Sequence, residues 1–124
     1  MPKFDNANPS RFDIPGVTFT AIASPSRGTK ESTMWRATVA PGSDGAVHQV
    51  TREELVFALS GEGAVRIEGE THPLAPGDAF AVPPFTDFQI GCRGDTPFEA
   101  VFVLPAGGRA IVADRPAFQP PWSV

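Results

Sequence analysis

The stretch GSDGAVHQVTREELVFALSG, from Gly42 to Gly61, decides whether this chain is interpreted as helical or as β-sheet. It holds one of the two histidines, a pair of adjacent glutamates and the longest uninterrupted apolar segment, Leu55 to Leu59. Thr51 to Glu54 has the spacing of a helix capping box in front of an apolar run. The run itself is short and contains Val and Phe, which is typical of a buried strand.

The length of the apolar run favours the strand. A helix that ended at Ser60 would have only about two turns and would be apolar on every face, which suits no surface helix. A strand also explains the residues that follow, because Gly61 to Gly63 is a turn signal and Ala64 to Glu68 alternates apolar and polar side chains. We therefore expect a strand that enters a hairpin.

Three residues of this stretch are candidates for a binding or catalytic site. Side chains alternate along a strand, so His48, Val50 and Glu54 share one face unless a bulge before Glu54 changes the parity. A histidine and a carboxylate on one inward face provide the groups for a metal site or for an acid–base pair.

The spacing of this stretch resembles the first conserved motif of the cupin family. Gly42, His48, Val50, Glu54 and Gly61 follow one another with five, one, three and six residues between them. That spacing of glycine and acidic positions is the part of the motif that the chain keeps.

A later segment resembles the second cupin motif. Gly77 to Pro83 matches its opening, and Phe85 and Phe88 stand where the family usually has glycine and histidine. The resemblance covers about residues 34 to 104. It implies an all-β fold, the double-stranded β-helix or jelly-roll barrel.

The resemblance is incomplete at the metal site, where typical metal-binding cupins supply three histidines and one glutamate. Carried over residue by residue, His48 and Glu54 are kept, whereas Val50 and Phe88 stand at the other two positions. A catalytic zinc site normally has three protein ligands and a structural one has four. The resemblance therefore implies no firmly held cofactor, and a divalent metal ion would have only His48 and Glu54 as ligands.

Composition agrees with a barrel of short strands. Fourteen prolines and twelve glycines are spread through 124 residues without a period, which leaves room for many strands and almost no long helix. We expect one domain, with a barrel core over about residues 17–104, an irregular N-terminal arm over 1–16 and a C-terminal tail over 105–124. Phe118 and Trp122 are expected to hold the tail over apolar surface.

Charge and cysteine content limit the binding partners and the cellular compartment that the protein is expected to have. A net charge of −4 and a pI near 5.0 argue against binding to nucleic acid or to an anionic membrane. No apolar run approaches the length of a membrane span, and the first residues lack the pattern of a secretory signal. Cys92 is the single cysteine, so it excludes an internal disulfide and fits a reducing compartment. We therefore expect a cytoplasmic protein.

The expected ligand pocket extends beyond the first motif. Phe85 and Phe88 would supply apolar surface to it. Side chains alternate over Thr33 to Ala40, and two placements remain open for Arg36. It faces the cavity, where its guanidinium would hold an anionic group of the ligand, or it lies outside in water. His72 stands in a proline-containing edge pattern and is expected to be exposed rather than a ligand.

Three functions remain open. In the first, a binding module meets the polar group of a small molecule with His48 and Glu54, while Val50, Phe85 and Phe88 support its apolar part. In the second, an enzyme of the isomerase, dioxygenase or lyase type uses His48 and Glu54 as an acid–base pair or as partial metal ligands. In the third, the buried pair only remains from an ancestral site. The resemblance and the partly apolar outer faces also imply a homodimer.

Overall fold

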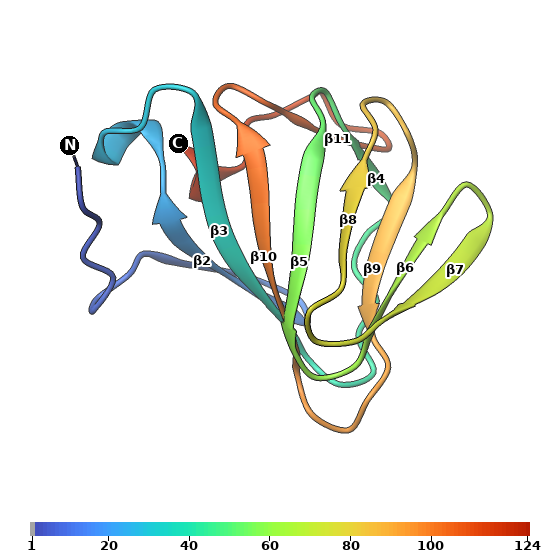
Figure 1. The fold of residues 1–124 in the computed structure, drawn as a ribbon. Helices are drawn as coiled ribbons and strands as arrows, with labels where there is room; N and C mark the ends of the chain where they lie inside the picture. Colours follow the sequence, from blue (N-terminus) through green and yellow to red (C-terminus); the bar gives the residue numbers. More distant parts are fainter. Residues whose placement is uncertain (1) are drawn as a thin grey trace.

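The computed structural model describes residues 2–124, which form two facing antiparallel sheets (Figure 1). The six-stranded sheet has the order β1-β2-β3-β10-β5-β8, and the five-stranded sheet has the order β11-β4-β9-β6-β7. The strands are β1 (Arg11–Ile14), β2 (Val17–Ala23), β3 (Ser32–Val39), β4 (His48–Val50), β5 (Glu54–Ser60), β6 (Gly63–Ile67), β7 (Glu70–Leu74), β8 (Ala79–Val82), β9 (Phe88–Cys92), β10 (Phe98–Pro105) and β11 (Ala110–Val112). Two 3-10 turns, η1 (Pro25–Arg27) and η2 (Pro121–Ser123), complete them, and residues 2–124 contain no helix that is long and apolar enough to cross a membrane. This is a jelly-roll barrel, the predicted fold class.

The strand predicted over Leu55 to Leu59 is confirmed as β5, and the helix alternative is wrong. β5 pairs with β10 on one side and with β8 on the other. Its side chains alternate between buried and exposed positions, as a strand with one face on a core requires. The pairing on both sides therefore decides the conformation of the segment, and the capping-box spacing has no effect on it.

The hairpin expected after β5 does not form, because the turn carries the chain into the other sheet. β6 pairs with β7 and β9 instead of β5. Gly61 has a φ of 77°, and a Cβ there would collide with the Pro97 carbonyl oxygen. At Gly63 a Cβ would lie 2.6 Å from the Phe98 ring. Only glycine permits this close crossing over the start of β10.

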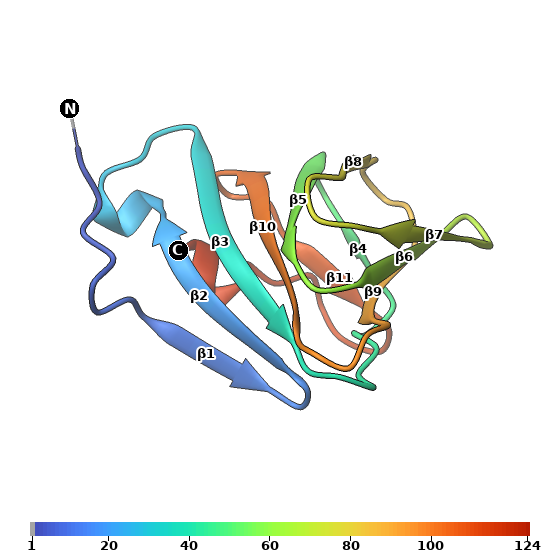
Figure 2. The ribbon, with the colours of Figure 1, turned by 60° about the horizontal axis from the view of Figure 1, so that its bottom comes forward.

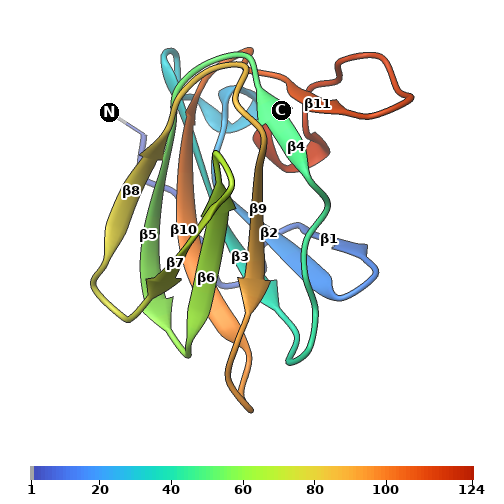
Figure 3. The ribbon, with the colours of Figure 1, turned by 90° about the vertical axis from the view of Figure 1, so that its right-hand side faces the viewer.

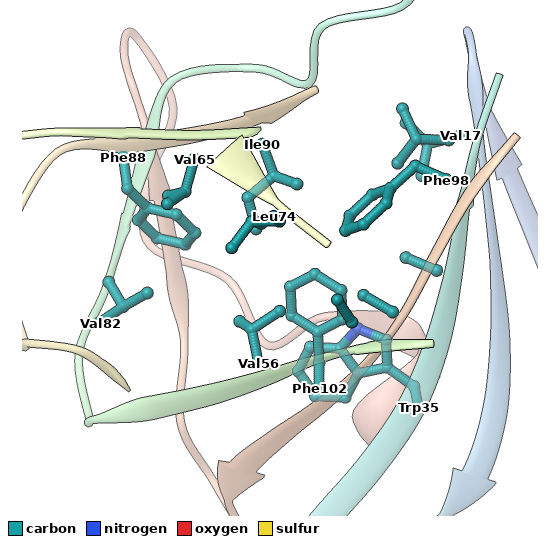
Figure 4. Close-up of a cluster of buried hydrophobic side chains, with 14 of the residues drawn as sticks. Val17, Trp35, Val56, Val65, Leu74, Val82, Phe88, Ile90, Phe98 and Phe102 are labelled. Carbon is teal, nitrogen blue, oxygen red and sulfur yellow. The ribbon is translucent and has the colours of Figure 1, made fainter. Parts of the chain in front are cut away.

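The core fills the space between the two sheets. Figure 4 shows Trp35 and Phe102 from the six-stranded sheet facing Val65, Leu74 and Ile90, and all five are buried. Burying one such side chain stabilises the fold by roughly 1.5–3 kcal/mol relative to an exposed one. A single cluster of side chains therefore holds the two sheets together.

The N-terminal arm is more regular than expected, because Arg11–Ile14 forms β1 and pairs with β2. The residues before β1 are held by Arg27, the last residue of η1. Its guanidinium donates to Asn6 Oδ1 at 2.7 Å and to the Asp5 carbonyl oxygen at 3.0 Å, and it lies over the Phe4 ring. One side chain thus fastens the arm to the connection between β2 and β3.

The C-terminal tail returns to the inner side of the six-stranded sheet. Figure 2 shows its last turn, η2, beside β2 and β3. The Trp122 indole stacks on Phe19 with 3.7 Å between ring centroids, and its centroid lies 6.3 Å from that of Trp35. The prediction that Trp122 holds the tail over apolar surface is confirmed.

Candidate functional site

His48 begins β4 and is half-buried, with its imidazole tilted against the Phe88 ring at 4.2 Å between centroids. Its Nδ1 lies 2.8 Å from the Ala46 carbonyl oxygen. A carbonyl oxygen only accepts, so Nδ1 carries the hydrogen, and Nε2 of the neutral ring keeps a free lone pair. Burial lowers the pKa of His48, and the hydrogen bond to Ala46 opposes that shift only in part. The imidazole is therefore neutral at pH 7.

Glu54 begins β5, faces inward and is 3% exposed. Its cross-strand neighbour on β8 is Val82, which is completely buried. Among residues 2–124, neither a hydrogen bond nor an ion pair reaches the Glu54 carboxyl group. Burial raises the pKa of Glu54 to about 8. The group is therefore mainly protonated at pH 7, and in this form it donates one hydrogen bond as well as accepting.

Val50 and Phe88, which stand where the resemblance to metal-binding cupins implies further histidines, face inward. Both are almost completely buried, with exposed fractions of 2% and 1%. Figure 4 shows Phe88 and Val82 pointing toward each other from opposite sheets. Together with His48 and Glu54, Val50 and Phe88 form what we call the inner site. Its two polar groups are the half-buried His48 imidazole and the buried Glu54 carboxyl.

The geometry that joins His48 to Glu54 differs from the expected one. β4 ends at Val50 in the five-stranded sheet, and β5 begins at Glu54 in the six-stranded sheet. Residues 51–53 cross between them. The two side chains therefore face the interior from opposite sheets, whereas the sequence analysis expected them on one face of a continuous strand.

Two residues expected in the pocket lie outside the inner site. Phe85 is 63% exposed, although its N–H donates to the Val50 carbonyl oxygen at 2.8 Å. Its φ of 57° falls in the left-handed region, which costs a residue with a side chain roughly 1–2 kcal/mol. Arg36 is exposed on the outer face of β3, because Trp35 and Ala37 take the inward positions. Of its two open placements, the structure has the one in water.

The donors of the inner site do not fit a tightly held metal ion. Across residues 2–124, no three His, Cys, Asp or Glu side chains are grouped closely enough to bind one ion. His48 Nε2 and the Glu54 carboxyl are two donors, fewer than the three or four of a zinc site. An ion there would depend on water in surroundings that Val50 and Phe88 make apolar. His72, the other histidine, is exposed as expected.

Hollows also occur elsewhere on the described part of the chain, and only the first of the three described next shares a residue, Phe88, with the inner site. The first, of about 300 Å³, lies where β6 ends and β9 begins, and Arg66, Phe88 and Gln89 line it. The second, which we call the outer groove, has about 340 Å³ and lies over β5, β8 and β10 on the outer face of the six-stranded sheet. The third, the edge hollow, has about 390 Å³ and lies between β7 and β8.

The sequence analysis missed the outer groove and the edge hollow, which share Ala79 and Phe80. Because the segment is apolar, burial throughout would be expected for Ala79 to Val82. Ala79 and Ala81 are exposed, since they lie with their partners Phe57 and Leu55 on the uncovered outer face of the sheet. The one available signal was an apolar segment without the charge or proline that usually protects an edge strand.

Comparison with known proteins agrees with this fold. Residues 35–104 match the family model described as the cupin domain. The match covers more than half of the 124 residues, so the chain belongs to the cupin family.

Curated relatives include small-molecule binders by name. Auxin-binding protein 1 of Arabidopsis thaliana is 35% identical over 77 residues, which are 61% of this chain and 38% of that protein. Auxin-binding protein T85 of Nicotiana tabacum is 35% identical over 78 residues, or 60% of this chain and 42% of that protein. The chain spans about two fifths of the length of these relatives.

Solved structures share the architecture. The polyketide cyclase RemF from Streptomyces resistomycificus superimposes with a TM-score of 0.81, covering 94% of this chain and 87% of that one, at 14% identity. KdgF from Halomonas sp. has a TM-score of 0.65 and 26% identity, covering 81% of this chain and 92% of that one. The likeness to RemF, at its low identity, shows the fold alone.

Proposed function

We propose that this chain binds a small, mainly apolar molecule at the inner site without a tightly held metal ion. The observation that supports this most is the Glu54 carboxyl group, which is buried among apolar side chains and has no polar partner among residues 2–124. A buried polar group without a hydrogen bond costs roughly 1–3 kcal/mol. A ligand that supplies the missing partner regains that free energy on binding.

The protonation states define the kind of ligand. At pH 7, Glu54 offers a hydrogen to a carbonyl or hydroxyl oxygen, and His48 Nε2 accepts a hydrogen from a hydroxyl or an amide. Arg36 lies outside, so the inner site has no cation to balance a carboxylate. We therefore infer that the preferred ligand is uncharged, with an apolar body beside Val50 and Phe88.

The auxin-binding relatives suggest a first matched pair of probes. Indole-3-acetic acid, an auxin, and its uncharged amide, indole-3-acetamide, differ mainly in the charge of the polar end. We expect the amide to bind this chain at least about tenfold more tightly at pH 7, because an unbalanced buried carboxylate costs more than 1.4 kcal/mol. Preference for the acid, abolished by a chelator, would contradict the metal-free proposal.

Calorimetric titration of the native chain and two variants tests the role of Glu54. Glu54→Leu is expected to weaken amide binding by about tenfold or more while raising the free energy of unfolding, because an unpaired buried acid is replaced by hydrocarbon. The matched control, Arg36→Gln, should bind like the native chain. If Glu54→Leu bound the amide with unchanged affinity, the proposal would be wrong.

A cupin enzyme of the isomerase, dioxygenase or lyase type is the second candidate. The opposite pKa shifts of Glu54 and His48 favour it, since one provides a neutral acid and the other a neutral base at pH 7, the two forms that proton transfer requires. Catalysis of proton exchange at carbon next to a carbonyl, followed by NMR in D₂O, would support this role. Exchange that persists in both Glu54→Gln and His48→Ala would exclude these residues as the acid and base.

A homodimer is proposed for the same chain. Leu55 and Phe57 are 49% and 45% exposed on the outer face of the six-stranded sheet, and Val101 and Val103 lie beside them in the outer groove. Contiguous exposed apolar side chains are typical of an interaction surface.

A further inference from the structure

Four strands lie at the edges of the two sheets, and three of them are protected against pairing with another chain. β1 carries the charged residues Arg11 and Asp13, and β7 contains Pro73. β11 is covered by the tail segment around Phe118, which bonds to it through main-chain groups. β8, with the sequence AFAV, has neither charge nor proline nor cover, and Figure 3 shows it at the margin of the molecule beside β5. An unprotected edge strand is a template for another strand.

The main-chain groups of Ala79 and Ala81 point away from the sheet. The Ala58 N–H donates to the Asp78 carbonyl oxygen at 2.9 Å, which fixes the phase of the ladder between β5 and β8. In an antiparallel ladder, hydrogen-bonded pairs alternate with non-bonded pairs. The even-numbered residues of β8 therefore bond to β5, and the two alanines present their N–H and C=O groups at the free edge.

We propose that two copies of this chain pair antiparallel through β8 about a two-fold axis at Phe80, which joins their six-stranded sheets. The inference rests on the homodimer proposed above and gives it a defined interface. It is independent of the ligand proposed for the inner site. A two-fold contact uses the same surface on both copies, so β8 must be complementary to itself.

The ladder leaves one suitable register. Centring the axis on Ala79 places Ala81 opposite Gly77, whose N–H already donates within its own chain at 2.8 Å. Centring it on Ala81 places Ala79 opposite Pro83, which has no N–H. Centring it on Phe80 places each alanine opposite the other alanine of the second copy. Every free N–H then meets a free carbonyl oxygen.

The side chains of β8 fit this arrangement on both faces. The outer groove continues across the axis over Ala79 and Ala81, whose small side chains leave Leu55 and Phe57 accessible. On the inner face, Phe80 of each copy meets its counterpart at the axis beside the edge hollow. Aromatic pairs across strands add stability. No charged side chain lies between residues 79 and 86, so like charges do not oppose each other at the contact.

Sedimentation equilibrium of the native chain and two lysine variants tests the interface. The native chain is expected to be a dimer at 200 μM, and Ala81→Lys a monomer with the same far-ultraviolet circular dichroism. Thr71→Lys, the matched control on the edge strand β7, should remain a dimer. A native chain that is monomeric at this concentration overturns both the homodimer and its interface. A folded, dimeric Ala81→Lys overturns the interface and leaves the homodimer standing.

Two further measurements do not depend on the folding of Ala81→Lys. Amide hydrogen exchange at Ala79 and Ala81 in the native chain should slow as the protein concentration rises, and exchange independent of concentration contradicts the pairing. In a Cys92→Ser background, Phe80→Cys should form a disulfide-linked dimer in air, because directly opposite, non-bonded residues have Cα atoms about 4.5 Å apart. Ala79→Cys should not, since its two copies lie beyond the reach of a disulfide. Equal cross-linking of both variants contradicts the register.

Discussion

Two segments bounded by glycine, residues 42–61 and 77–91, build the same part of the barrel but bring different chemistry to it. The first supplies His48 and Glu54, two polar groups with pKa values shifted in opposite directions. The second supplies Phe88 to the interior and leaves Phe85 outside. The strands of the two segments nevertheless pair with each other, β4 with β9 and β5 with β8. Turns and pairing therefore specify the barrel, whereas the inward side chains set its chemistry.

The retained polar groups and the hydrophobic replacements also differ in their effect on stability. Phe88 is packed between His48 and Val82, so it stabilises the fold. Glu54 faces the same interior without a partner among residues 2–124 and must give up its charge to stay there. The second segment contributes packing, and the first retains two polar groups whose charged forms burial disfavours.

Removing the packing of the second segment should have the largest effect. Phe88→Ala is expected to lower the free energy of unfolding by about 3–5 kcal/mol, because the buried ring leaves a cavity. Denaturant unfolding followed by circular dichroism measures the change. Phe85→Ala, the matched control at the exposed phenylalanine of the same segment, should lose much less. Equal losses in the two variants would contradict the contrast between them.

Restoring histidines at the two apolar positions should convert the inner site into a metal site. Val50→His combined with Phe88→His gives a four-donor set with His48 and Glu54. Zinc at a hundredfold excess over its Kd is then expected to add about 2.7 kcal/mol to the free energy of unfolding of the double variant. The native chain should show no comparable shift in thermal unfolding. An equal shift in both proteins would mean that the native donors already suffice.

The pH dependence of stability should distinguish the first segment from the second. The pKa of Glu54 is raised to about 8 in the folded chain, above its usual value of 4.5. Between these values the folded state binds a proton that the unfolded state has lost, so stability falls as the pH rises. Relative to Glu54→Gln, the native chain should lose about 2 kcal/mol between pH 6 and pH 7.5.

Comparing the native chain with Glu54→Gln removes the contribution of His48, which both proteins share. That contribution has the opposite sign, because the lowered pKa of His48 makes its share of the stability disappear as the pH falls below the ordinary value of 6.5. Parallel stability curves for the two proteins, measured by denaturant unfolding, would show that Glu54 is not the group responsible.

The smallest effect is expected at Phe85, where the second segment has an aromatic residue on a left-handed backbone. Phe85→Gly relieves roughly 1–2 kcal/mol of strain and loses roughly 0.5–1 kcal/mol through greater freedom of the unfolded chain. A net gain of up to about 1.5 kcal/mol in the free energy of unfolding should appear in chemical denaturation. Phe85→Ala keeps the strain and should show no gain. A glycine variant no more stable than the alanine variant would argue against strain.

Much of the barrel could be predicted from the sequence, because its local signals agree with the final pairing. β5 follows from a short apolar run between turns, and the inward positions of Val50 and Glu54 follow from alternation and a family resemblance. The motif glycine Gly61 also has a structural reason, since a Cβ there would collide with the Pro97 carbonyl oxygen.

The remaining features depend on which strands become neighbours, and alternation within one strand does not contain that information. It cannot show that the chain changes sheets at residues 51–53 and again after Gly61. It leaves both faces of β3 possible, so Arg36 had two placements. An apolar run such as Ala79 to Val82 looks the same at the centre of a sheet and at its edge.

The docked tail gives the protein a built-in optical reporter. The chain has two tryptophans and no tyrosine, and both indoles belong to the aromatic cluster in which Trp122 stacks on Phe19. Neither indole N–H finds a hydrogen-bond partner among residues 2–124. The tryptophan fluorescence of the folded chain therefore arises from one aromatic cluster under β2 and β3. Release of the last few residues would expose Trp122 to water and shift its emission to longer wavelengths. The release of the tail can therefore be followed by stopped-flow fluorescence without any added dye.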